Sequence, residues 1–184
     1  MKNITDYIKI YKKALPDNFC KLLISKATEN QGEWAEAKAI KGRNQYRSAT
    51  FFTMIDREYK TKKGRVFNFD PMLYATIGNL LKLYQKSFKN VHITSDEGYQ
   101  LLRYKTGDFH TEHIDNCVQS QPRKVSIVIM CNDDFEGGEL KFHGDHVVSL
   151  GVGDAIIFPS NFMFPHQVST ITKGIRYVVS AFCN

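Results

Sequence analysis

Short apolar patterns of both strand and helix type occur in the first part of the chain. Ile8 and Ile10 alternate with polar residues, and this alternation predicts a strand over Ile4–Tyr11. Apolar residues at helical spacing then predict a helix that begins at Leu15-Pro16-Asp17 and ends near Asn30. Two further strands are predicted at Trp34–Ile40 and Tyr46–Met54, with a turn-rich link between them.

A basic loop and a second helix follow. The basic sequence of Tyr59–Arg65 predicts a solvated connection; the alternative is a loop that closes over an acidic or polymeric substrate. At Asp70-Pro71, a capping residue followed by proline predicts the start of a helix. Its apolar residues fall on one stripe, which predicts packing against a sheet: Met72, Leu73, Ile77, Leu80, Leu81, Tyr84 and Phe88.

From residue 99 onward the pattern changes to short strands separated by turns. The run Val125–Cys131 is almost continuously apolar, as in a buried strand. Eight strands are predicted: Tyr99–Lys105, Phe109–His113, Val125–Cys131, Glu139–Phe142, Val147–Leu150, Ala155–Phe158, Pro165–Ser169 and Arg176–Phe182. Many short strands with Gly and Asp turns indicate a sandwich or a jelly roll, so the fold class is mainly β with supporting helices.

The length of 184 residues fits one domain with a sizeable core. We expect a single catalytic domain over residues 1–184, with strands and supporting helices in 1–98 and the jelly-roll core in 99–184. No apolar run approaches the roughly 20 residues that span a bilayer, and the N-terminus lacks the apolar core of a secretion signal. The four cysteines form no CxxC pair, which favours free thiols. These features predict a soluble, cytoplasmic protein.

The positive charge of the chain is unevenly distributed. The net charge is +6; residues 1–98 carry 18 Lys and Arg against 10 Asp and Glu, and residues 99–184 carry 7 against 9. A basic surface can attract nucleic acid or an acidic substrate, but a solvated basic surface is the commoner interpretation. Binding to nucleic acid is therefore an alternative rather than the main expectation.

Candidate metal ligands lie in the stretch Tyr104–Asp115. Alternate residues of a strand point to one face, so His113 and Asp115 can converge on one point. A jelly roll brings residues about 50 positions apart into one cavity, which makes His166 a candidate third ligand. Two histidines and a carboxylate with open positions form the facial triad of non-heme Fe(II) oxygenases. Arg176 is a cation that can bind a carboxylate next to such a metal.

Other residues compete for this role when spacing alone is considered. His110-Thr111-Glu112 is also a His-x-acid pair, but strand alternation puts it on the face opposite His113 and Asp115. His143-Gly144-Asp145 has the composition of an exposed hairpin tip. Cys117 lies close to Asp115, but iron of this type prefers N and O ligands. Spacing by itself leaves these alternatives open.

The surrounding motifs resemble the Fe(II)/2-oxoglutarate-dependent oxygenase superfamily, in particular its prolyl 4-hydroxylase-like branch. The resemblance spans residues 99–183, nearly half of the chain. The matching residues are Tyr104-x-x-Gly107-x-Phe109-x-x-x-His113-x-Asp115, Asn132–Leu140, Gly153-Asp154-Ala155, Phe158-Pro159, Pro165-His166-x-Val168 and Thr172-x-Gly174-x-Arg176-Tyr177. A weaker match precedes them at Tyr46-Arg47-Ser48 and Phe51-Phe52.

The resemblance implies a double-stranded β-helix (jelly-roll, cupin-like) core and a role for each matched residue. His113, Asp115 and His166 would bind Fe(II). Arg176 would bind the distal carboxylate of 2-oxoglutarate, and Tyr104 would donate its hydroxyl to the same cosubstrate. O2 would be the co-reactant, with ascorbate as a candidate reductant.

The resemblance also implies an activity, with two departures. We expect a monomeric dioxygenase that hydroxylates an unactivated C–H bond of a peptide or protein, with a prolyl side chain first, and releases succinate and CO2. Ile129 and Met130 stand where oxygen-sensing prolyl hydroxylases carry a second cosubstrate-binding tyrosine. Phe182 stands where nucleic-acid demethylases carry a further arginine. The alternatives are a nucleic-acid or small-molecule oxygenase of the same superfamily, or a non-catalytic jelly-roll binding module.

Overall fold

The structure is a computed structural model that describes residues 3–29, 34–37, 46–53, 58–60, 66–116 and 122–184. Residues 61–65 of the predicted basic loop and Cys117 lie outside these ranges, so the predictions about them stay predictions. Cys20, Cys131 and Cys183 are free and buried.

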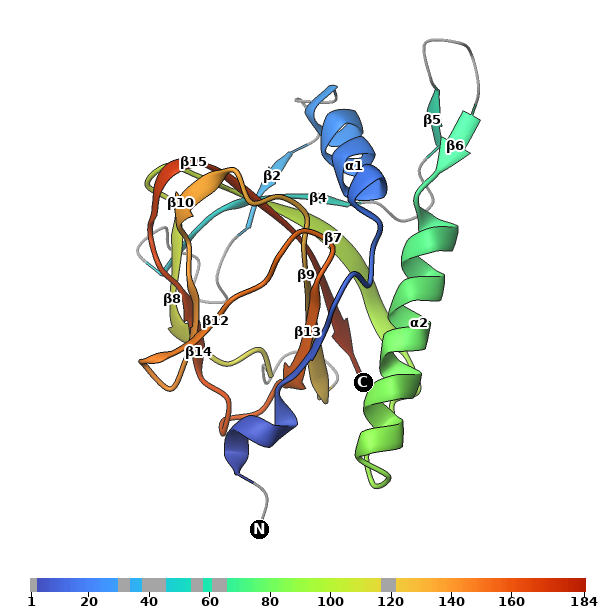
Figure 1. Ribbon diagram of the computed structural model, residues 1–184, viewed down its shortest axis with the longest axis vertical. Coiled ribbons are helices and arrows are strands. Elements are labelled where there is room, and N and C mark those ends of the chain that lie inside the picture. Colours follow the sequence, from blue (N-terminus) through green and yellow to red (C-terminus); the bar gives the residue numbers. More distant parts are fainter. Residues whose placement is uncertain (1–2, 30–33, 38–45, 54–57, 61–65, 117–121) are drawn as a thin grey trace.

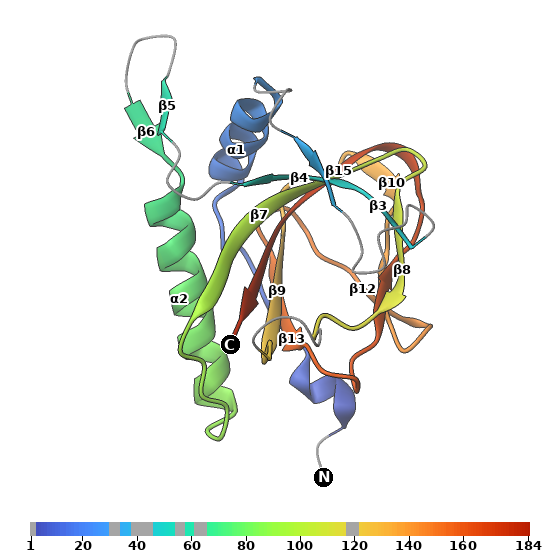
Figure 2. The same cartoon turned by 180° about the vertical axis from the view of Figure 1, so that it is seen from behind.

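Two antiparallel sheets form the body of the molecule (Figures 1 and 2). The large sheet has the order β1-β13-β9-β15-β7-β4-β2, with β10 paired to β15, and the small sheet has the order β12-β11-β14-β8-β3. The large-sheet strands are β1 Lys9–Tyr11, β2 Ala35–Glu36, β4 Thr50–Thr53, β7 Asp96–Lys105, β9 Val125–Met130, β10 Phe135–Gly137, β13 Ala155–Pro159 and β15 Ile171–Cys183. The small-sheet strands are β3 Arg47–Ser48, β8 Phe109–His113, β11 Leu140–Phe142, β12 His146–Val148 and β14 His166–Val168. A separate pair consists of β5 Glu58–Lys60 and β6 Val66–Asn68.

Each of the eight strands predicted after residue 99 is present, and the fold is mainly β with supporting helices, as predicted. The turn-rich sequence before Glu139 also contains β10, which the hydrophobic pattern does not reveal because the strand is short and rich in glycine and acid. The strand predicted over Tyr46–Met54 is instead two strands in different sheets: β3 pairs with β8, and β4 pairs with β7. The chain crosses between the sheets at the buried Ala49.

Helices α1 Asp17–Glu29 and α2 Asp70–Ser87 lie on the outer side of the large sheet (Figure 1). Asp70 is the first helical residue of α2 and not its cap, since Phe69 occupies the cap position. The side-chain oxygen of Asn68 accepts the Asp70 amide hydrogen at 2.8 Å. In the predicted apolar stripe of α2, Met72 is exposed and Leu81 is half-buried, and the other members are buried. No helix within the described residues has both the length and the apolar character needed to cross a bilayer.

The N-terminal segment begins with a short 3-10 helix, η1 Ile4–Tyr7, and only then enters β1. The strand predicted over the whole of Ile4–Tyr11 is therefore too long. The Asn3 amide donates to the Asp6 carboxylate at 2.8 Å. Such a local side-chain bond competes with extended structure at the start of a helix.

Side chains of the large sheet alternate between two apolar clusters. On β7, Leu101 packs against the helices, while Leu102 and Tyr104 face the space between the sheets. On β15, Val179 packs on the helix side and Val178 on the inner side. The helices therefore stabilise the outer face of the sheet, and the inner face remains available to form a site together with the small sheet.

Candidate metal centre

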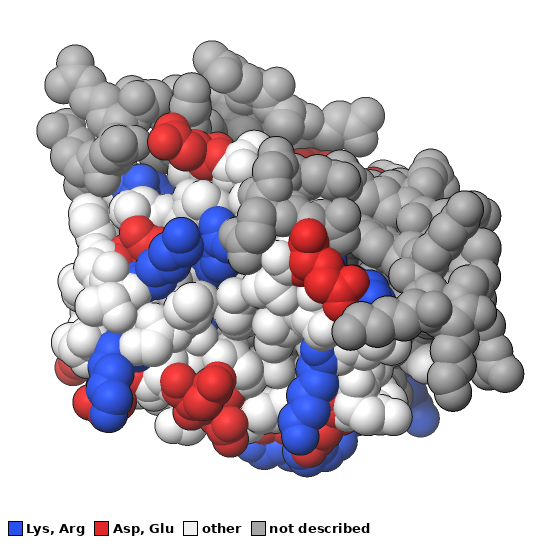
Figure 3. Space-filling model, turned by 90° about the horizontal axis from the view of Figure 1, so that it is seen from above, with Lys and Arg blue, Asp and Glu red and all other residues white. Residues whose placement is uncertain are grey.

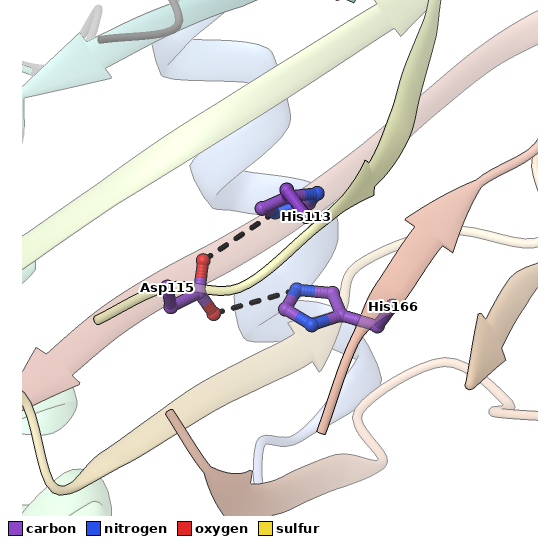
Figure 4. Close-up of side chains that lie close together, drawn as sticks. All are labelled: His113, Asp115 and His166. Carbon is purple, nitrogen blue, oxygen red and sulfur yellow. Dashed lines mark ion pairs between the residues drawn. The ribbon is translucent and has the colours of Figure 1, made fainter. Parts of the chain in front are cut away.

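Three side chains converge: His113 at the end of β8, Asp115 in the segment that follows it, and His166 on the neighbouring strand β14 (Figure 4). Strands β8 and β14 are antiparallel, with His113 opposite His166, and Asp115 follows two residues after His113. One carboxylate oxygen of Asp115 lies 3.4 Å from Nε2 of His113, and the other lies 3.4 Å from Nε2 of His166. One ligand atom from each residue lies within 4.8 Å of the other two. This is the donor set and the spacing that a facial triad requires.

Backbone carbonyl groups orient both imidazole rings. Nδ1 of His113 lies 2.8 Å from the carbonyl oxygen of Thr111, and Nδ1 of His166 lies 3.1 Å from that of Phe164. A carbonyl oxygen accepts hydrogen bonds only, so Nδ1 carries the hydrogen in each ring. In the neutral form of each ring, Nε2 then presents its lone pair toward Asp115. Hydrogen bonds of this kind commonly fix the rings of metal-binding histidines.

The protonation states of the cluster also suit a cation. Burial raises the pKa of the Asp115 carboxyl, but the neighbouring His166 and His113 and a hydrogen bond from Ser126 outweigh this effect and hold the pKa below its ordinary value. Burial lowers the pKa of His166, against the opposing effect of the Asp115 carboxylate. The carboxylate is thus ionised and His166 is neutral, which are the forms that bind metals.

His110 differs from its predicted position. Its ring stacks on that of His113, with centroids 3.5 Å apart and an interplanar angle of 21°. The reason is a register shift between β8 and β14: His166 pairs with His113, but Val168 pairs with His110, so three steps on β8 match two on β14. A bulge of this kind breaks strict alternation, and the prediction that His110 faces away from His113 is wrong. Burial, followed by the neighbouring His113 and Arg47, lowers the pKa of His110 to about 2, so its ring is neutral.

The other predicted competitors lie apart from the cluster. Glu112 is exposed. His143, Asp145 and His146 are exposed at the β11–β12 hairpin, as their sequence predicts. Among the described residues, the group that can hold a metal ion is His113, Asp115 and His166.

A buried cation lies beside a tyrosine in the cavity that the three side chains of the cluster also line. Arg176 on β15 is paired with Tyr104 on β7, and its guanidinium carbon lies 5.4 Å from the Tyr104 ring centroid. Arg176 is 1% exposed, and its Nε has no hydrogen-bond partner. Burial lowers its pKa. A buried cation without a counter-ion among the described residues is costly unless an anion binds to it.

Two adjoining cavities lead to the three side chains. The inner cavity, of about 50 Å³, is lined by all three, by Tyr104 and Arg176, and by apolar residues of both sheets. The outer cavity, of about 300 Å³, shares His113 and Asp115 but not Tyr104 or Arg176. A larger groove of about 810 Å³ lies elsewhere, between the N-terminal segment and residues 159–164, and contains none of the three.

Arg123 and Glu97, which no sequence motif marks, support the loop that carries Asp115. The Arg123 guanidinium donates to both carboxylate oxygens of Glu97 at 2.7 and 2.6 Å, and to the Asp115 carbonyl oxygen at 3.1 Å. It also lies 3.7 Å from the ring centroid of Phe182. These contacts join residues from three distant parts of the chain, so only the tertiary structure reveals them.

The sequence of this part of the chain matches a known family. Residues 99–184 match the family described as the 2OG-Fe(II) oxygenase superfamily. Residues 99–184, a little under half of the chain, are thus similar to that superfamily.

Individual relatives are described as hydroxylases. A PKHD-type hydroxylase of Caulobacter vibrioides is 36% identical over 86 residues, which are 40% of this chain and 37% of the relative. A PKHD-type hydroxylase of Aliarcobacter butzleri is 25% identical over 161 residues, which are 81% of this chain and 66% of the relative. The chain thus spans little more than a third of the length of the first of these curated relatives.

Solved structures confirm the fold. A Trichoplax adhaerens prolyl hydroxylase in complex with a hypoxia inducible factor peptide fragment superposes with a TM-score of 0.78 at 17% identity, covering 97% of this chain and 84% of that one. A Pseudomonas putida prolyl-4-hydroxylase superposes with a TM-score of 0.71 at 17% identity, covering 98% and 96%. The predicted double-stranded β-helix is therefore confirmed.

The residues present fit the cofactors that the superfamily implies. Two imidazole nitrogens and a carboxylate oxygen suit Fe(II). The buried, unpartnered Nε of Arg176 fits the carboxylate of 2-oxoglutarate. Both features occur along one cavity.

Proposed function

We propose that this chain is an Fe(II)- and 2-oxoglutarate-dependent hydroxylase. The observation that carries the proposal is a single cavity with a metal-binding cluster at one part of its wall and, at another, a buried arginine whose Nε has no partner among the described residues. A dicarboxylate that is chelated to a metal through one end needs a cation for its other end. A few converging polar groups on a partly apolar wall are the kind of lining that fixes the orientation of a ligand.

Three groups of residues would act in the site: the metal ligands, the residues that bind 2-oxoglutarate, and the apolar wall of the inner cavity. When bound, Fe(II) with 2-oxoglutarate and O2 supplies the oxidation: 2-oxoglutarate is converted to succinate and CO2, and one oxygen atom enters a C–H bond. His113, Asp115 and His166 would hold the metal on one side and leave its other positions open.

Arg176 would bind the distal carboxylate of 2-oxoglutarate, and the Tyr104 hydroxyl would donate a hydrogen bond to it. The apolar wall of the inner cavity would exclude water from the reacting atoms. That wall comprises Leu102, Val128, Leu140, Val168 and Val178.

For substrate, we propose a peptidyl side chain, with proline first. The support is the likeness to a prolyl hydroxylase that was solved with a bound peptide fragment, together with the PKHD-type relatives. A nucleic-acid substrate has less support. On the face shown in Figure 3, the described basic and acidic side chains are interspersed rather than gathered into a basic patch. Ascorbate as reductant, a monomeric state, a cytoplasmic location and a single catalytic domain remain part of the proposal.

The decisive experiment is an anaerobic titration of 2-oxoglutarate into the Fe(II)-loaded protein, followed by visible metal-to-ligand charge-transfer absorption. We expect a saturable band that is lost in His166→Ala and strongly weakened in Arg176→Ala. His143→Ala is the matched control, because His143 is exposed at a hairpin tip and should leave the band intact. A folded, iron-loaded protein without a band would contradict the proposal and favour a non-catalytic binding module.

A turnover measurement complements the titration. Asp115→Ala should abolish succinate formation while the protein stays folded, because the carboxylate is the anionic ligand of the cluster. Glu112→Ala, an exposed carboxylate one residue before His113, should turn over as the wild type does. Normal turnover in Asp115→Ala would show that the ligand assignment is wrong.

A further inference from the structure

The outer cavity contains four charged side chains, and three of them already have a partner or a place in the metal-binding cluster. Glu97 and Arg123 form a two-pronged ion pair across it. Asp115 lies between the two imidazoles of the metal-binding cluster. Arg47 is different: its Nε is buried without a hydrogen-bond partner, and its guanidinium forms no ion pair with any described residue.

The fold holds Arg47 directly beside the metal-binding cluster. Strand β3 is the edge of the small sheet, and Arg47 pairs with His110 on β8. The His110 ring in turn stacks on His113. Arg47 lines both the inner and the outer cavity, so its side chain lies where the two meet.

The cosubstrate does not account for Arg47. A 2-oxoglutarate molecule has two carboxylates, of which one would chelate the metal and the other would bind Arg176. The outer cavity lacks both Arg176 and Tyr104, so it is the space left for the substrate. A guanidinium whose Nε is shielded from water gains most from an anion that accepts two parallel hydrogen bonds, and a carboxylate has that geometry.

We propose that Arg47 binds a carboxylate of the substrate, so that the enzyme selects a substrate with an acidic group next to the carbon that it hydroxylates. This inference rests on the proposed function of the site and specifies its substrate class. The carboxylate can come from an acidic side chain in a peptide, or from the terminal carboxylate of an amino acid or short peptide. Both sources offer the same chemistry to Arg47.

Three short fluorescent peptides test the inference. The first has Asp directly beside Pro with both termini blocked, the second has Asn in that place, and the third is the Asn peptide ending in a free carboxylate. Binding is measured by anisotropy with Mn(II)-loaded, 2-oxoglutarate-saturated protein under anaerobic conditions, so that no turnover is needed. The quantity compared is the ratio of dissociation constants between the neutral peptide and each carboxylate peptide.

We expect the wild type to bind at least one carboxylate peptide about 10- to 100-fold more tightly than the neutral one, as for a charge-assisted hydrogen-bonded pair. In Arg47→Gln this ratio should fall to about one, and in Arg47→Lys it should be intermediate because Lys keeps the charge but not the planar fork. Lys173→Gln removes an exposed cation that pairs with Glu136 and should keep the wild-type ratio. Arg47→Glu should reverse the preference in favour of a peptide with Lys in place of Asp.

The outcomes separate this inference from the proposed function. If the wild type shows the cosubstrate band but binds the three peptides equally or not at all, the role of Arg47 is wrong and the proposed function stands. A preference that persists in Arg47→Gln and is not reversed in Arg47→Glu would likewise overturn it. If the cosubstrate band itself is absent, the proposed function fails. A preference for the first or for the third peptide supports the inference and identifies the source of the carboxylate.

Discussion

At the scale of single residues, two buried arginines are of opposite kinds: Arg103 lies over Trp34 on the helix side of the large sheet, and Arg176 lines the inner cavity. Arg103 is 6% exposed; its Nε donates to Thr50 at 3.0 Å, and its guanidinium stacks on Trp34 at 4.1 Å. Arg176 is 1% exposed and its Nε has no partner. A charge that is buried without a partner lowers stability. The proposed binding of 2-oxoglutarate by Arg176 would offset this cost.

The same substitution at these two arginines should therefore have opposite effects. Arg176→Met should raise the free energy of unfolding of the cosubstrate-free protein by about 1–3 kcal/mol, because an apolar side chain replaces an uncompensated charge. Arg103→Met should lower it by about 1–3 kcal/mol, because it removes a satisfied hydrogen bond and a stacked contact. Urea denaturation of both variants measures the difference. An Arg176→Met protein less stable than Arg103→Met would contradict this account.

At the scale of elements, the position of Arg176 depends on how β10 and β15 pack. Gly174, two residues before Arg176, pairs with Phe135 and has φ +79°. A Cβ at Gly174 would lie 2.6 Å from the Asp134 carbonyl oxygen. Glycine is thus required both for the backbone conformation and for the close approach of the two strands.

Gly174→Ala should consequently lower the stability of the protein more than an alanine at a second glycine that has a similar φ but open space around its Cβ position. Gly144 is that control, since it has φ +83° and no atom within 4 Å of its Cβ position. Both variants incur the cost of a left-handed conformation, about 1–2 kcal/mol. Gly174→Ala should cost about 1–3 kcal/mol more because of overpacking, and it should weaken the 2-oxoglutarate band. Thermal denaturation that gives equal losses for the two variants would refute the role of the close approach.

The N-terminal segment is attached to β13 through Asp154. This buried carboxylate accepts hydrogen bonds from the Lys12 side chain at 2.8 Å, the Lys13 amide at 3.0 Å and the Gly151 amide at 2.8 Å. Burial raises the pKa of the Asp154 carboxyl, but these hydrogen bonds outweigh it, and the pKa lies below its ordinary value. Because the pKa is lower in the folded than in the unfolded state, the stabilisation is present above about pH 4 and is lost as the pH falls through the folded-state pKa.

Asp154→Asn should therefore lower the free energy of unfolding by about 1–3 kcal/mol at pH 7. The difference from the wild type should shrink as the pH is lowered from about 6 toward 3, where the wild-type carboxyl is also protonated. Urea denaturation across this pH range measures it. Asp17→Asn, which removes an exposed ion pair with Lys13, should have little effect at either pH. A difference between Asp154→Asn and the wild type that stays constant with pH would disprove the linkage.

At the scale of the whole molecule, the large sheet lies between the apolar cluster that packs on the helices and the cluster that surrounds the proposed site. Its outer face and the two helices form one apolar cluster, and its inner face and the small sheet form another around the cavities. The outer cluster includes Leu23 on α1, which is fully buried.

Leu23→Ala should lower the free energy of unfolding by about 2–5 kcal/mol, because it leaves a cavity in the outer cluster. The half-saturation concentration for 2-oxoglutarate should stay within about twofold, because a shift of that size corresponds to less than about 0.5 kcal/mol. Chemical denaturation and the cosubstrate titration measure the two quantities on one preparation. A large loss of cosubstrate affinity in a folded Leu23→Ala protein would show that the two clusters are coupled.

Much of the fold could be predicted from local patterns. The eight strands after residue 99 and the helix with Leu73, Ile77 and Leu80 follow from apolar periodicity, because burial on one face imposes that periodicity. The pattern did not reveal β10, or the division of Tyr46–Met54 between two sheets. Hydrogen bonding to distant strands determines both features, and it leaves no local signal.

The sequence by itself determined which chemistry is proposed for the site. His113, Asp115, His166 and Arg176 are candidates by residue type and position, and Tyr104 is one by the resemblance of the surrounding motifs. Residue type and motif order are local properties of the chain. Only the tertiary structure decided what surrounds that chemistry. The bulge that turns His110 onto His113 arises from the pairing of β8 with β14, which are far apart in sequence. The same holds for Arg47, whose Nε is buried without a partner among the described residues. A periodic pattern records which face of an element is buried, but pairing between strands decides what each buried side chain meets.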